Sequence, residues 1–256
     1  MATSITTDYF LDSAIAVQQM KGAGHRSGLD AIMLAATPPQ DLQGQVADLG
    51  AGAGVVGLAA AHRCRHSRVD LFEINPQLTE LSNQSLQLEQ NRHLAGRVTG
   101  YCADITQSGE PLASSGGQPG SYAAILCNPP YNDNSHQASP DDQRSLAHMG
   151  SADAVDIWIK TAATMAAHRG LLAMILRPAN LLDFANPIRR SFGNAIIKPL
   201  HPRADQPASR LLLGSIKNSR AALKILPPLV LHHSDGSFTD EADDILRGRR
   251  AIDLFA

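Results

Sequence analysis

Chemistry on a planar nitrogen is suggested by four consecutive residues near the middle of the chain: Asn128, Pro129, Pro130 and Tyr131. The amide oxygen of Asn128 and a proline carbonyl can both accept hydrogen bonds from an NH2 group. Tyr131 adds a ring face on which a flat substrate can stack. The tetrapeptide is therefore a candidate site for methylating or otherwise modifying an amine. A proline pair is also an ordinary way to end a strand.

The elements around the tetrapeptide would place it where ligands bind. It follows an apolar run, Tyr122 to Cys127, which predicts a buried strand, and open α/β sheets hold their ligands at the C-terminal ends of strands. Upstream, a strand predicted at Gln45 to Leu49 runs into a glycine-rich turn, Gly50 to Gly54, and then into Val55 to Ala61, which is compatible with a helix. Such a turn lets the backbone approach a ligand closely and directs free N–H groups toward it.

Three acidic residues help to identify the ligand of this turn. Glu73 follows a strand predicted at Val69 to Phe72, where such folds hydrogen-bond the ribose hydroxyls of a nucleoside cofactor. Asp48 precedes the glycines, where a carboxylate suits the cationic amino-acid end of S-adenosylmethionine and would repel a pyrophosphate. Asp104 follows a third strand, Arg97 to Tyr101, and is placed to meet the adenine amine. Each acid also fits a helix N-cap, a loop position or a solvated surface, and the glycines also fit a turn without a ligand.

In their order along the chain, these motifs resemble those of class I S-adenosylmethionine-dependent methyltransferases of the small-domain group, which carry Asn-Pro-Pro-Tyr as their fourth motif. Within that group the chain is most similar to bacterial tRNA adenine-N6 methyltransferases that act beside the anticodon of a valine tRNA. Three stretches carry this closer match: Gly24 to Leu34, His201 to Leu213 and Leu223 to Phe238. The loop from Ser108 to Gly120 and the insert from Asn132 to Met149 depart from the pattern, which leaves the nucleic acid, or even the substrate class, open.

The resemblance implies S-adenosylmethionine as the cofactor, and it assigns roles by motif. Around the substrate base it places Asn128, Pro129, Pro130 and Tyr131. Around the cofactor it places residues of the glycine turn and of the strand ends: Asp48, Gly50, Ala51, Gly52, Gly54, Glu73, Ile74, Asp104, Ile105 and Asn128. Residues 1–44 would form a cap over the cofactor site and bring Arg26 or Asp30 near the pocket. Residues 45–256 would form the methyltransferase domain, in one structural unit with the cap.

Length and composition agree with a single enzyme-sized unit. A chain of 256 residues with 43% hydrophobic residues can bury a substantial core, and an aromatic content of 4% implies that this core is aliphatic. No apolar run approaches the roughly 20 residues of a membrane span, and Met1 to Tyr9 lacks the features of a secretory signal. The three cysteines have no metal-ligand spacing, which favours buried thiols in a reducing compartment. We therefore expect a cytoplasmic protein without a metal site.

Strands and helices alternate along the chain, which predicts a mainly parallel sheet with helices on both faces. Further elements are expected as helices at Pro76 to Glu89, Ala152 to His168 and Leu181 to Ser191 and as a strand at Leu171 to Leu176. The last strands, Ala195 to Leu200 and Arg210 to Ile216, are joined by a stretch without room for a crossover helix, so they should pair antiparallel. The expected fold is α/β: a Rossmann-like seven-stranded sheet, mostly parallel, with one antiparallel strand.

Charge gives a separate indication of the partner. The formal net charge of −2 argues against a surface that is basic throughout. Residues 187–224, however, contain eight basic residues and one acidic residue, Asp205, which makes a formal charge of +7. Such a stretch suits the phosphates of RNA, and Arg26, Arg203 and Arg210 are candidate contacts. It also fits a solvated edge whose lysines and arginines prevent aggregation between strands.

The expected mechanism is an in-line attack of a nitrogen on the sulfonium methyl, accelerated mostly by positioning. Asn128 and the Pro129 carbonyl would accept the hydrogens of an adenine N6 as this nitrogen becomes tetrahedral, through bonds that strengthen in the transition state. Tyr131 would hold the base unstacked from its RNA loop.

Three alternative functions remain open on the sequence alone. Methylation of a glutamine N5 in a peptide-release factor uses the same tetrapeptide, with a protein as partner. Small-molecule O-methyl transfer would need a base, for which the candidates are His136, His148, His201, His232 and His233. A non-catalytic RNA-binding scaffold with a relic cofactor pocket is the third alternative.

Overall fold

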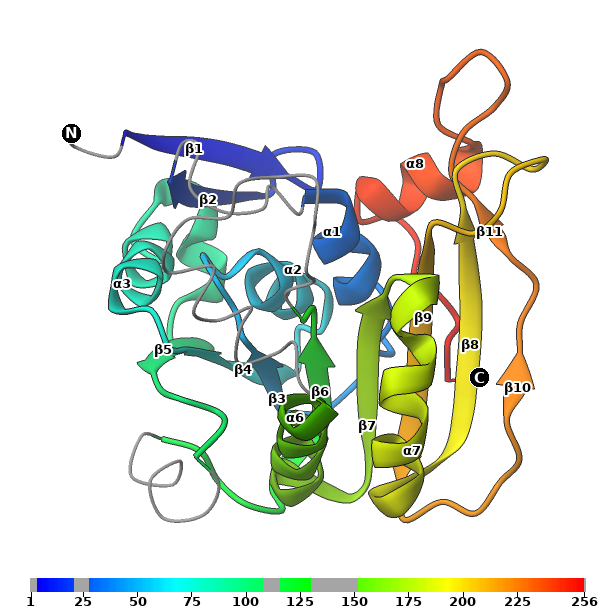
Figure 1. Cartoon of the computed structure of the whole chain (residues 1–256). Helices are drawn as coiled ribbons and strands as arrows, with labels where there is room; N and C mark the ends of the chain where they lie inside the picture. Colours follow the sequence, from blue (N-terminus) through cyan, green and yellow to red (C-terminus); the bar gives the residue numbers. More distant parts are fainter. Residues whose placement is uncertain (1–3, 21–27, 108–115, 130–151, 256) are drawn as a thin grey trace.

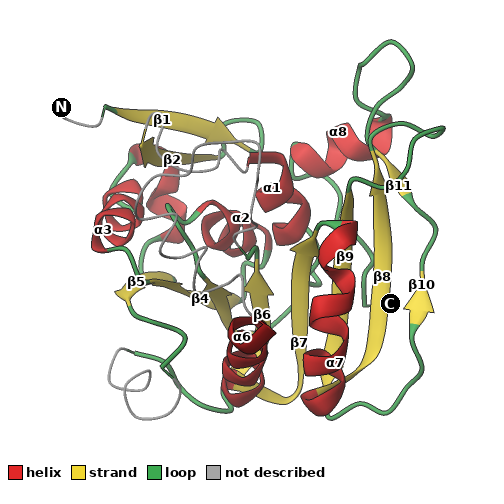
Figure 2. Ribbon diagram, viewed as in Figure 1, coloured by secondary structure: helices red, strands yellow, loops and turns green. Residues whose placement is uncertain are grey.

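A mixed sheet with its strands in the order β10-β8-β9-β7-β6-β3-β4-β5, and with β11 beside β8, forms the centre of the molecule (Figures 1 and 2). The structure is a computed structural model that describes residues 4–20, 28–107, 116–129 and 152–255. The strands of this sheet are β3 (Gly44–Leu49), β4 (Ser67–Glu73), β5 (Val98–Cys102), β6 (Tyr122–Cys127), β7 (Ala166–Leu176), β8 (Phe192–His201), β9 (Arg210–Lys217), β10 (Lys224–Ile225) and β11 (Leu229–Val230).

The pairing of the strands confirms the expected topology. Strands β5, β4, β3, β6 and β7 pair in parallel, and β9 pairs antiparallel with both β7 and β8. Seven long strands with one reversed member therefore make up the sheet among the described residues, as the sequence predicted. The two-residue strands β10 and β11, which both pair in parallel with β8, were not predicted.

Helices cover both faces of the sheet. The α-helices are α1 (Gly28–Ala35), α2 (Val55–Arg63), α3 (Pro76–Ser85), α6 (Ala152–Met165), α7 (Leu181–Ser191) and α8 (Asp240–Leu246), and the 3-10 helices are η1 (Glu89–Leu94) and η2 (Pro178–Asn180). Residues of α1, α2 and α8 share one apolar core, while α6 and α7 contribute to a second core on the opposite face, in front of the sheet in Figure 1. No described helix has the length and apolar character needed to cross a membrane.

Two expected helix ends were placed too late. Helix α3 begins as predicted, because Asn75 caps it by accepting hydrogen bonds from the backbone N–H groups of Gln77 and Leu78, but it ends at Ser85 and gives way to η1. Helix α6 ends at Met165, so that His168 lies in β7 instead of in the helix. The chain can enter the sheet this early because Ala166 pairs with Tyr122 of β6.

An N-terminal hairpin, which the sequence did not predict, lies outside the main sheet. It consists of β1 (Ile5–Phe10) and β2 (Ile15–Met20), which pair antiparallel. Its turn places Leu11, Asp12 and Ser13 at positive φ angles of 56°, 55° and 65°. The buried Asn91 of η1 holds β2 in place, since its side chain accepts a hydrogen bond from the Ala16 N–H at 3.1 Å and donates one to the Ala16 carbonyl at 2.6 Å.

Candidate functional site

Parallel pairing aligns the carboxyl ends of four neighbouring strands. Leu49 of β3 pairs with Phe72 of β4 on one side and with Cys127 of β6 on the other, and Glu73 pairs with Cys102 of β5. Neighbouring strands lie about 4.8 Å apart, so the edge from β6 to β5 is about 14 Å long. The residues that follow these strands share that edge, which has the length of an extended nucleoside ligand.

The candidate residues of the sequence follow one another along this edge. Asn128 and Pro129 follow β6, the glycine turn follows β3, Glu73 ends β4, and Asp104 lies two residues beyond β5. Asn128 is partly exposed, while Pro129 is buried. The structure thus brings the described part of the tetrapeptide next to the glycine turn. Three further candidates, Pro130, Tyr131 and Arg26, lie outside the described residues.

The glycine turn needs glycine for two different reasons. Gly50, Gly52 and Gly54 have φ angles of +70°, +56° and +91°, which L side chains rarely adopt. A Cβ at Gly50 would lie 2.7 Å from the ring of Trp158, so that this position is closed from behind by α6. A Cβ at Gly52 would meet nothing within 4 Å, so the turn has free space on that side. The open side is where a ligand can approach the backbone.

Glu73 connects the glycine turn to the next loop. One carboxylate oxygen accepts a hydrogen bond from the Gly52 N–H and the other from the Asn75 N–H, both at 2.8 Å. Burial raises the pKa of Glu73, and the backbone hydrogen bonds from Asn75, Gly52 and Ile74 oppose that rise. Each carboxylate oxygen has a further lone pair, so Glu73 can still accept a hydroxyl of a bound ribose. Next to it, the Ile74 side chain is 54% exposed and offers an apolar surface at the same edge.

Asp48 lies beneath the turn and is only 1% exposed. Its carboxylate accepts a hydrogen bond from the Gly57 N–H in the first turn of α2 at 2.8 Å, although the N-cap residue of this helix is Gly54 and not Asp48. Burial raises the pKa of Asp48 to about 7, the hydrogen bond from Gly57 opposes this rise, and the negative charge of Glu73 adds to it. Its contact with a cationic ligand stays a prediction, but its charge lies at the base of the candidate site.

Sequence reasoning missed two residues that shape the site. Gly57 donates to Asp48, and a Cβ at this position would lie 2.0 Å from the Leu71 side chain, so α2 can approach β4 this closely only with glycine. The glycine within the predicted helix was the available signal. Trp158 of α6, which is 6% exposed, packs behind Gly50, and no local pattern in the sequence indicated this contact.

Asp104 and Ile105 form the end of the site beyond β5. One oxygen of Asp104 accepts from the Thr106 N–H at 2.9 Å and from its hydroxyl at 2.6 Å, which is the local turn pattern of a loop acid. The Ile105 side chain is buried in the core, and its carbonyl accepts a hydrogen bond from the Thr161 hydroxyl at 2.7 Å. Their roles toward a cofactor remain predictions.

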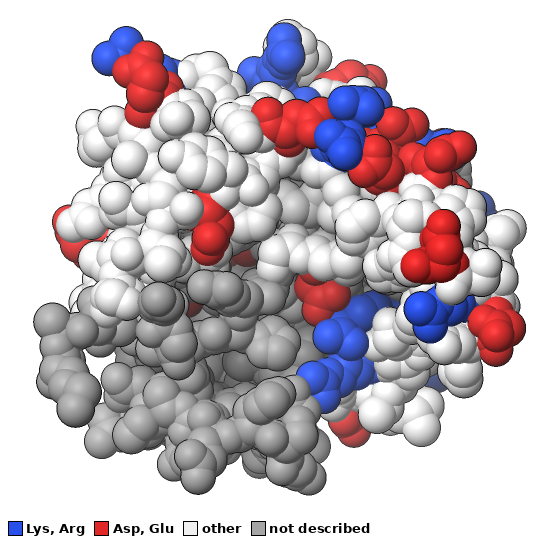
Figure 3. Space-filling model, turned by 90° about the horizontal axis from the view of Figure 1, so that it is seen from above, with Lys and Arg blue, Asp and Glu red and all other residues white. Residues whose placement is uncertain are grey.

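Several positive charges of residues 187–224 already have partners. Arg210 forms an ion pair with Asp30 at 2.7 Å, and Arg190 pairs with Asp156. Arg203, by contrast, is exposed. Strands β6 and β7 point upward in Figure 1, so Figure 3 looks onto their C-terminal ends, and there basic side chains lie beside acidic ones instead of forming a uniform basic surface. The structure therefore leaves only part of the formal charge free for a polyanion.

The Asp30–Arg210 pair connects the N-terminal segment to the candidate site's edge of the sheet. Strand β9 runs opposite to its neighbours, so its first residue, Arg210, lies at the edge where β7 and β8 end. Asp30 belongs to the first turn of α1. Whether residues 1–44 cover a cofactor remains a prediction, but α1 is attached at the appropriate edge.

Among the described residues, no group of three or more His, Cys, Asp or Glu side chains is arranged to hold a metal ion.

The chain is similar to known proteins in sequence and in structure. Residues 30–194 match the methyltransferase small domain. A solved structure from Agrobacterium tumefaciens, described as a predicted O-methyltransferase, is 30% identical, has a TM-score of 0.76, and is matched over 88% of this chain and 99% of that chain.

Several curated relatives bear the name tRNA1(Val) (adenine(37)-N6)-methyltransferase, among them two from Flavobacterium psychrophilum and Shewanella loihica. The relative from Flavobacterium psychrophilum is 27% identical over 161 residues, which are 62% of this chain and 64% of that protein. The relative from Shewanella loihica is 32% identical over 157 residues, which are 60% of this chain and 61% of that protein. The match thus spans less than two thirds of the length of either relative. The family match at residues 30–194 covers more than half of the length of this chain. The chain therefore belongs to the methyltransferase small domain family, as its motifs predicted.

Proposed function

We propose that the protein is an S-adenosylmethionine-dependent N-methyltransferase that modifies the exocyclic N6 of an adenine in tRNA. The observation that carries this proposal is the position of Asn128, which follows β6 directly beside the glycine turn that follows β3. An amide acceptor for an amino group and an open backbone cradle are therefore neighbours on one edge. Family membership and the names of the tRNA-modifying relatives support the same reaction.

The residues at the edge fit the proposed cofactor. The open side of Gly52 leaves room for the cofactor's amino-acid part, Glu73 has lone pairs for ribose hydroxyls, and the exposed Ile74 offers an apolar face for adenine. Asp48 adds negative charge beneath the turn, which favours a sulfonium and an ammonium group. When bound, S-adenosylmethionine supplies an activated methyl group, and the protein needs no nucleophile of its own.

The role of Asn128 follows from the electronic structure of adenine. The N6 lone pair is delocalised into the ring, so the amino group is a weak nucleophile until its nitrogen becomes tetrahedral. The Asn128 amide oxygen and the Pro129 carbonyl would accept the two N–H hydrogens and favour that geometry. These hydrogen bonds strengthen as positive charge develops on the nitrogen, so they lower the barrier more than they tighten ground-state binding.

Methyl transfer to oxygen is the second candidate, because the Agrobacterium structure is described as a predicted O-methyltransferase. A hydroxyl nucleophile would need a base near the methyl group. His201, the last residue of β8, is separated from β6 by β9 and β7, and its ring nitrogen already lies 2.7 Å from the Gln206 carbonyl. His136 and His148 lie outside the described residues. His201 therefore lies too far along the edge to act as a base beside Asn128, so this candidate histidine gives no support to methyl transfer to oxygen.

The proposal is more specific in naming RNA, and not another molecule, as the substrate. The exposed Arg203 and the other unpaired cations of residues 187–224 would contact phosphates, whereas the charge of Arg210 is balanced by Asp30. The alternative substrate, a glutamine amide in a release factor, would use the same edge without these cations. The cytoplasmic location stays a prediction from the sequence.

The decisive experiment offers a labelled methyl donor to the purified protein with total RNA, total protein and small metabolites in parallel. We expect label in RNA that digests to N6-methyladenosine. Label in protein would support glutamine methylation, and label in metabolites would support O-methyl transfer, so that either result contradicts the tRNA proposal.

Asn128→Ala tests the role of the amide. It should lower kcat by about a hundredfold while cofactor affinity changes little, which is the loss expected for an interaction made mainly in the transition state. Asn83→Ala, near the C-terminal end of α3 and away from the strand ends, is the matched control and should leave both kcat and cofactor affinity unchanged. Equal losses of turnover and of cofactor affinity in Asn128→Ala would indicate a structural role instead.

A further inference from the structure

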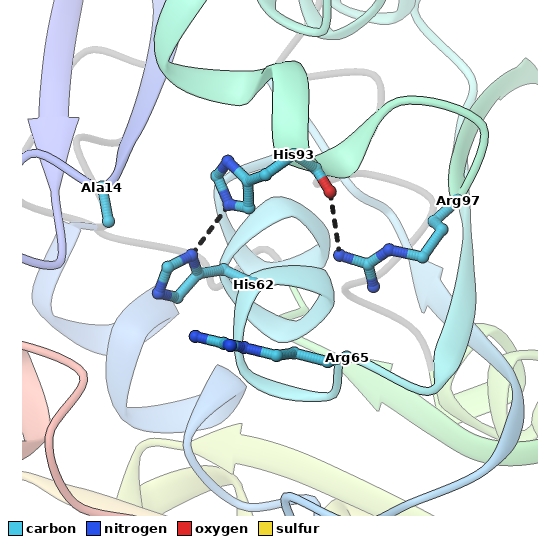
Figure 4. Close-up of a pocket in the computed structure, with 5 residues that line it drawn as sticks. All are labelled: Ala14, His62, Arg65, His93 and Arg97. Carbon is cyan, nitrogen blue, oxygen red and sulfur yellow. Dashed lines mark hydrogen bonds between the residues drawn. The ribbon is translucent and has the colours of Figure 1, made fainter.

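A second cleft lies at the opposite end of α2 from the glycine turn. It has a volume of about 500 Å³, and it is lined by Ala14, His62, Arg65, His93 and Arg97 (Figure 4). Helix α2 is nine residues long and rises 1.5 Å per residue, so the cleft is about 13 Å away from the glycine turn along the helix axis. It is therefore separate from the candidate methyl-transfer site.

All ionisable groups that line this cleft are basic. The Nδ1 atom of His62 lies 2.9 Å from the Nε2 atom of His93, so that one ring donates a hydrogen bond and the other accepts it. Figure 4 shows the two rings pointing toward each other, with Arg65 extending beneath His62. Burial lowers the pKa of His62 to about 4, and the charges of His93, Arg65, Arg63 and Arg97 act in the same direction. No carboxylate contributes to this shift.

Two of the neighbouring arginines lack partners among the described residues. Arg65 is exposed and makes no hydrogen bond or ion pair there. Arg63, the last residue of α2, is only 6% exposed, and none of its three guanidinium nitrogens has a hydrogen-bond partner. It does not line the cleft, but its charge acts on His62. A buried and unpaired guanidinium is unfavourable, and an anion bound nearby would offset that cost.

Arg97 has a different role in the cluster. Its guanidinium donates to the carbonyls of Ala61 at 2.9 Å, Ser67 at 3.3 Å and Cys64 at 3.4 Å, and also to that of His93 at 3.3 Å. The first group of carbonyls lies at and just beyond the C-terminus of α2, whose dipole would otherwise repel an anion. Arg97 thus neutralises the negative end of the helix, which leaves Arg63 and Arg65 as the uncompensated charges.

The acids of the surrounding elements are used elsewhere. Asp12, in the hairpin turn next to Ala14, pairs with Arg247 and Arg249, each at 2.8 Å. Glu89 of η1 pairs with Arg92 at 2.8 Å. Asp41 is exposed and acts on the Cys64 thiol, but it is not among the groups that shift His62. The described part of the chain therefore supplies no counter-ion to this cleft.

We propose that the cleft binds a phosphate group, which Arg65 holds by charge-assisted hydrogen bonds and which accepts a further hydrogen bond from the one N–H that the His62–His93 pair leaves free. A guanidinium fork and an imidazole N–H match the several acceptor oxygens of a tetrahedral phosphate. A cation is excluded by the surrounding arginines. The group comes either from free phosphate or from the backbone of an RNA, since both present the same oxygens.

Binding of inorganic phosphate to the full-length protein tests the proposal without any assumption about the reaction. Isothermal titration calorimetry at constant ionic strength should show saturable binding at one site. Arg65→Gln should weaken this binding about tenfold, which corresponds to the loss of one charge-assisted hydrogen bond, and His93→Gln, which removes the hydrogen-bond partner of His62, should weaken it less. Both side chains are exposed, so the variants should fold, and thermal unfolding followed by circular dichroism checks this.

The matched control is Arg68→Gln, which removes an exposed arginine of β4 that does not line the cleft. It should change phosphate affinity less than about twofold, since only screened, long-range charge is lost. The proposal is overturned if the wild-type protein shows no saturable phosphate binding, or if Arg68→Gln weakens binding as much as Arg65→Gln does.

A labelled RNA hairpin, followed by fluorescence anisotropy without cofactor, distinguishes the two sources of the phosphate. If the RNA backbone occupies the cleft, Arg65→Gln weakens RNA binding about tenfold and inorganic phosphate competes with the RNA. If free phosphate occupies it, Arg65→Gln weakens phosphate binding and leaves RNA binding unchanged. Because neither measurement requires methyl transfer, failure of the proposed function and failure of the phosphate site give different results.

Discussion

Replacing Asp48 by asparagine should make the protein more stable at alkaline pH, although Asp48 lies at the base of the candidate cofactor site. Asparagine keeps an oxygen that can accept the hydrogen bond from the Gly57 N–H, but it removes a carboxylate that is only 1% exposed. The variant therefore isolates the effect of the buried charge.

The magnitude follows from the raised pKa. A carboxyl group whose pKa is about 7 in the fold instead of 3.8 binds protons more tightly in the folded state than in the unfolded state. Each pKa unit between the folded and the unfolded state corresponds to 1.36 kcal/mol, so ionised Asp48 costs the folded protein about 4 kcal/mol above pH 7. The folded state binds the extra proton between about pH 4 and pH 7, so this cost grows as pH rises through that range and is then constant. At pH 5 it is about 1.6 kcal/mol.

Urea denaturation at about pH 5 and pH 8 measures this difference. Asp48→Asn should exceed the wild-type free energy of unfolding by about 2.5 kcal/mol more at pH 8 than at pH 5. Asp205→Asn, which changes an exposed loop acid, is the control and should alter stability by less than about 0.5 kcal/mol at either pH. At pH 8 Asp48→Asn should also bind S-adenosylmethionine more weakly, because a negative charge beneath a cationic ligand is lost. A wild-type protein that is more stable than Asp48→Asn by the same amount at both pH values would refute this reasoning.

Three further predictions address the turn, the hairpin and the second cleft. Gly52→Ala should cost only about 1–2 kcal/mol of stability, which is the penalty of a left-handed residue, but it should abolish cofactor binding. Gly50→Ala should destabilise the protein more, because its Cβ meets Trp158. Denaturation and calorimetry of both variants separate the loss of stability from the loss of binding. Asn91→Ala should lower the free energy of unfolding by about 2–4 kcal/mol, because three backbone groups lose their partner, and hydrogen exchange should show the hairpin amides opening first. The pKa of His62 should be about 4 in an NMR pH series and should be higher in Arg65→Gln. Because the neutral form of His62 is favoured in the fold, the protein should lose stability as pH falls from about 6.5 to 4. A normal titration of His62 would contradict its burial among cationic groups.

The strand ends and the glycine turn were predictable because local chemistry determines them. Tyr122 to Cys127 is an uninterrupted apolar run that ends at Asn128 and Pro129, and the strand has the predicted bounds. The glycines at 50, 52 and 54 all have positive φ, and glycine is the residue type that adopts this conformation without strain, so its presence indicated the turn. Asp48, Glu73 and Asp104 each lie at or just after the end of a predicted strand, which indicated that they share the carboxyl edge of the sheet.

The parts that the sequence did not reveal depend on contacts between distant residues. The hairpin turn uses left-handed Leu11, Asp12 and Ser13 without any glycine or proline, so its signal in the sequence was weak. The contact of Asp48 with a ligand stays a prediction, but its hydrogen bond with Gly57 was not expected, because Gly57 becomes its neighbour only when α2 packs against β4. Likewise, the charges of Arg210 and Arg190 are paired with acids far away in the chain, which a count of basic residues cannot show.

The hairpin turn also has a consequence for biosynthesis. Asp12 finds its ionic partners in Arg247 and Arg249, and the buried Leu11 packs beside Gly248, more than two hundred positions later in the chain. These contacts of the turn can therefore form only after the ribosome has released this late segment. Until then, Asn91 can already hold β2, but the buried side of the turn stays exposed on the nascent chain, where chaperones that shield apolar surface can bind during translation.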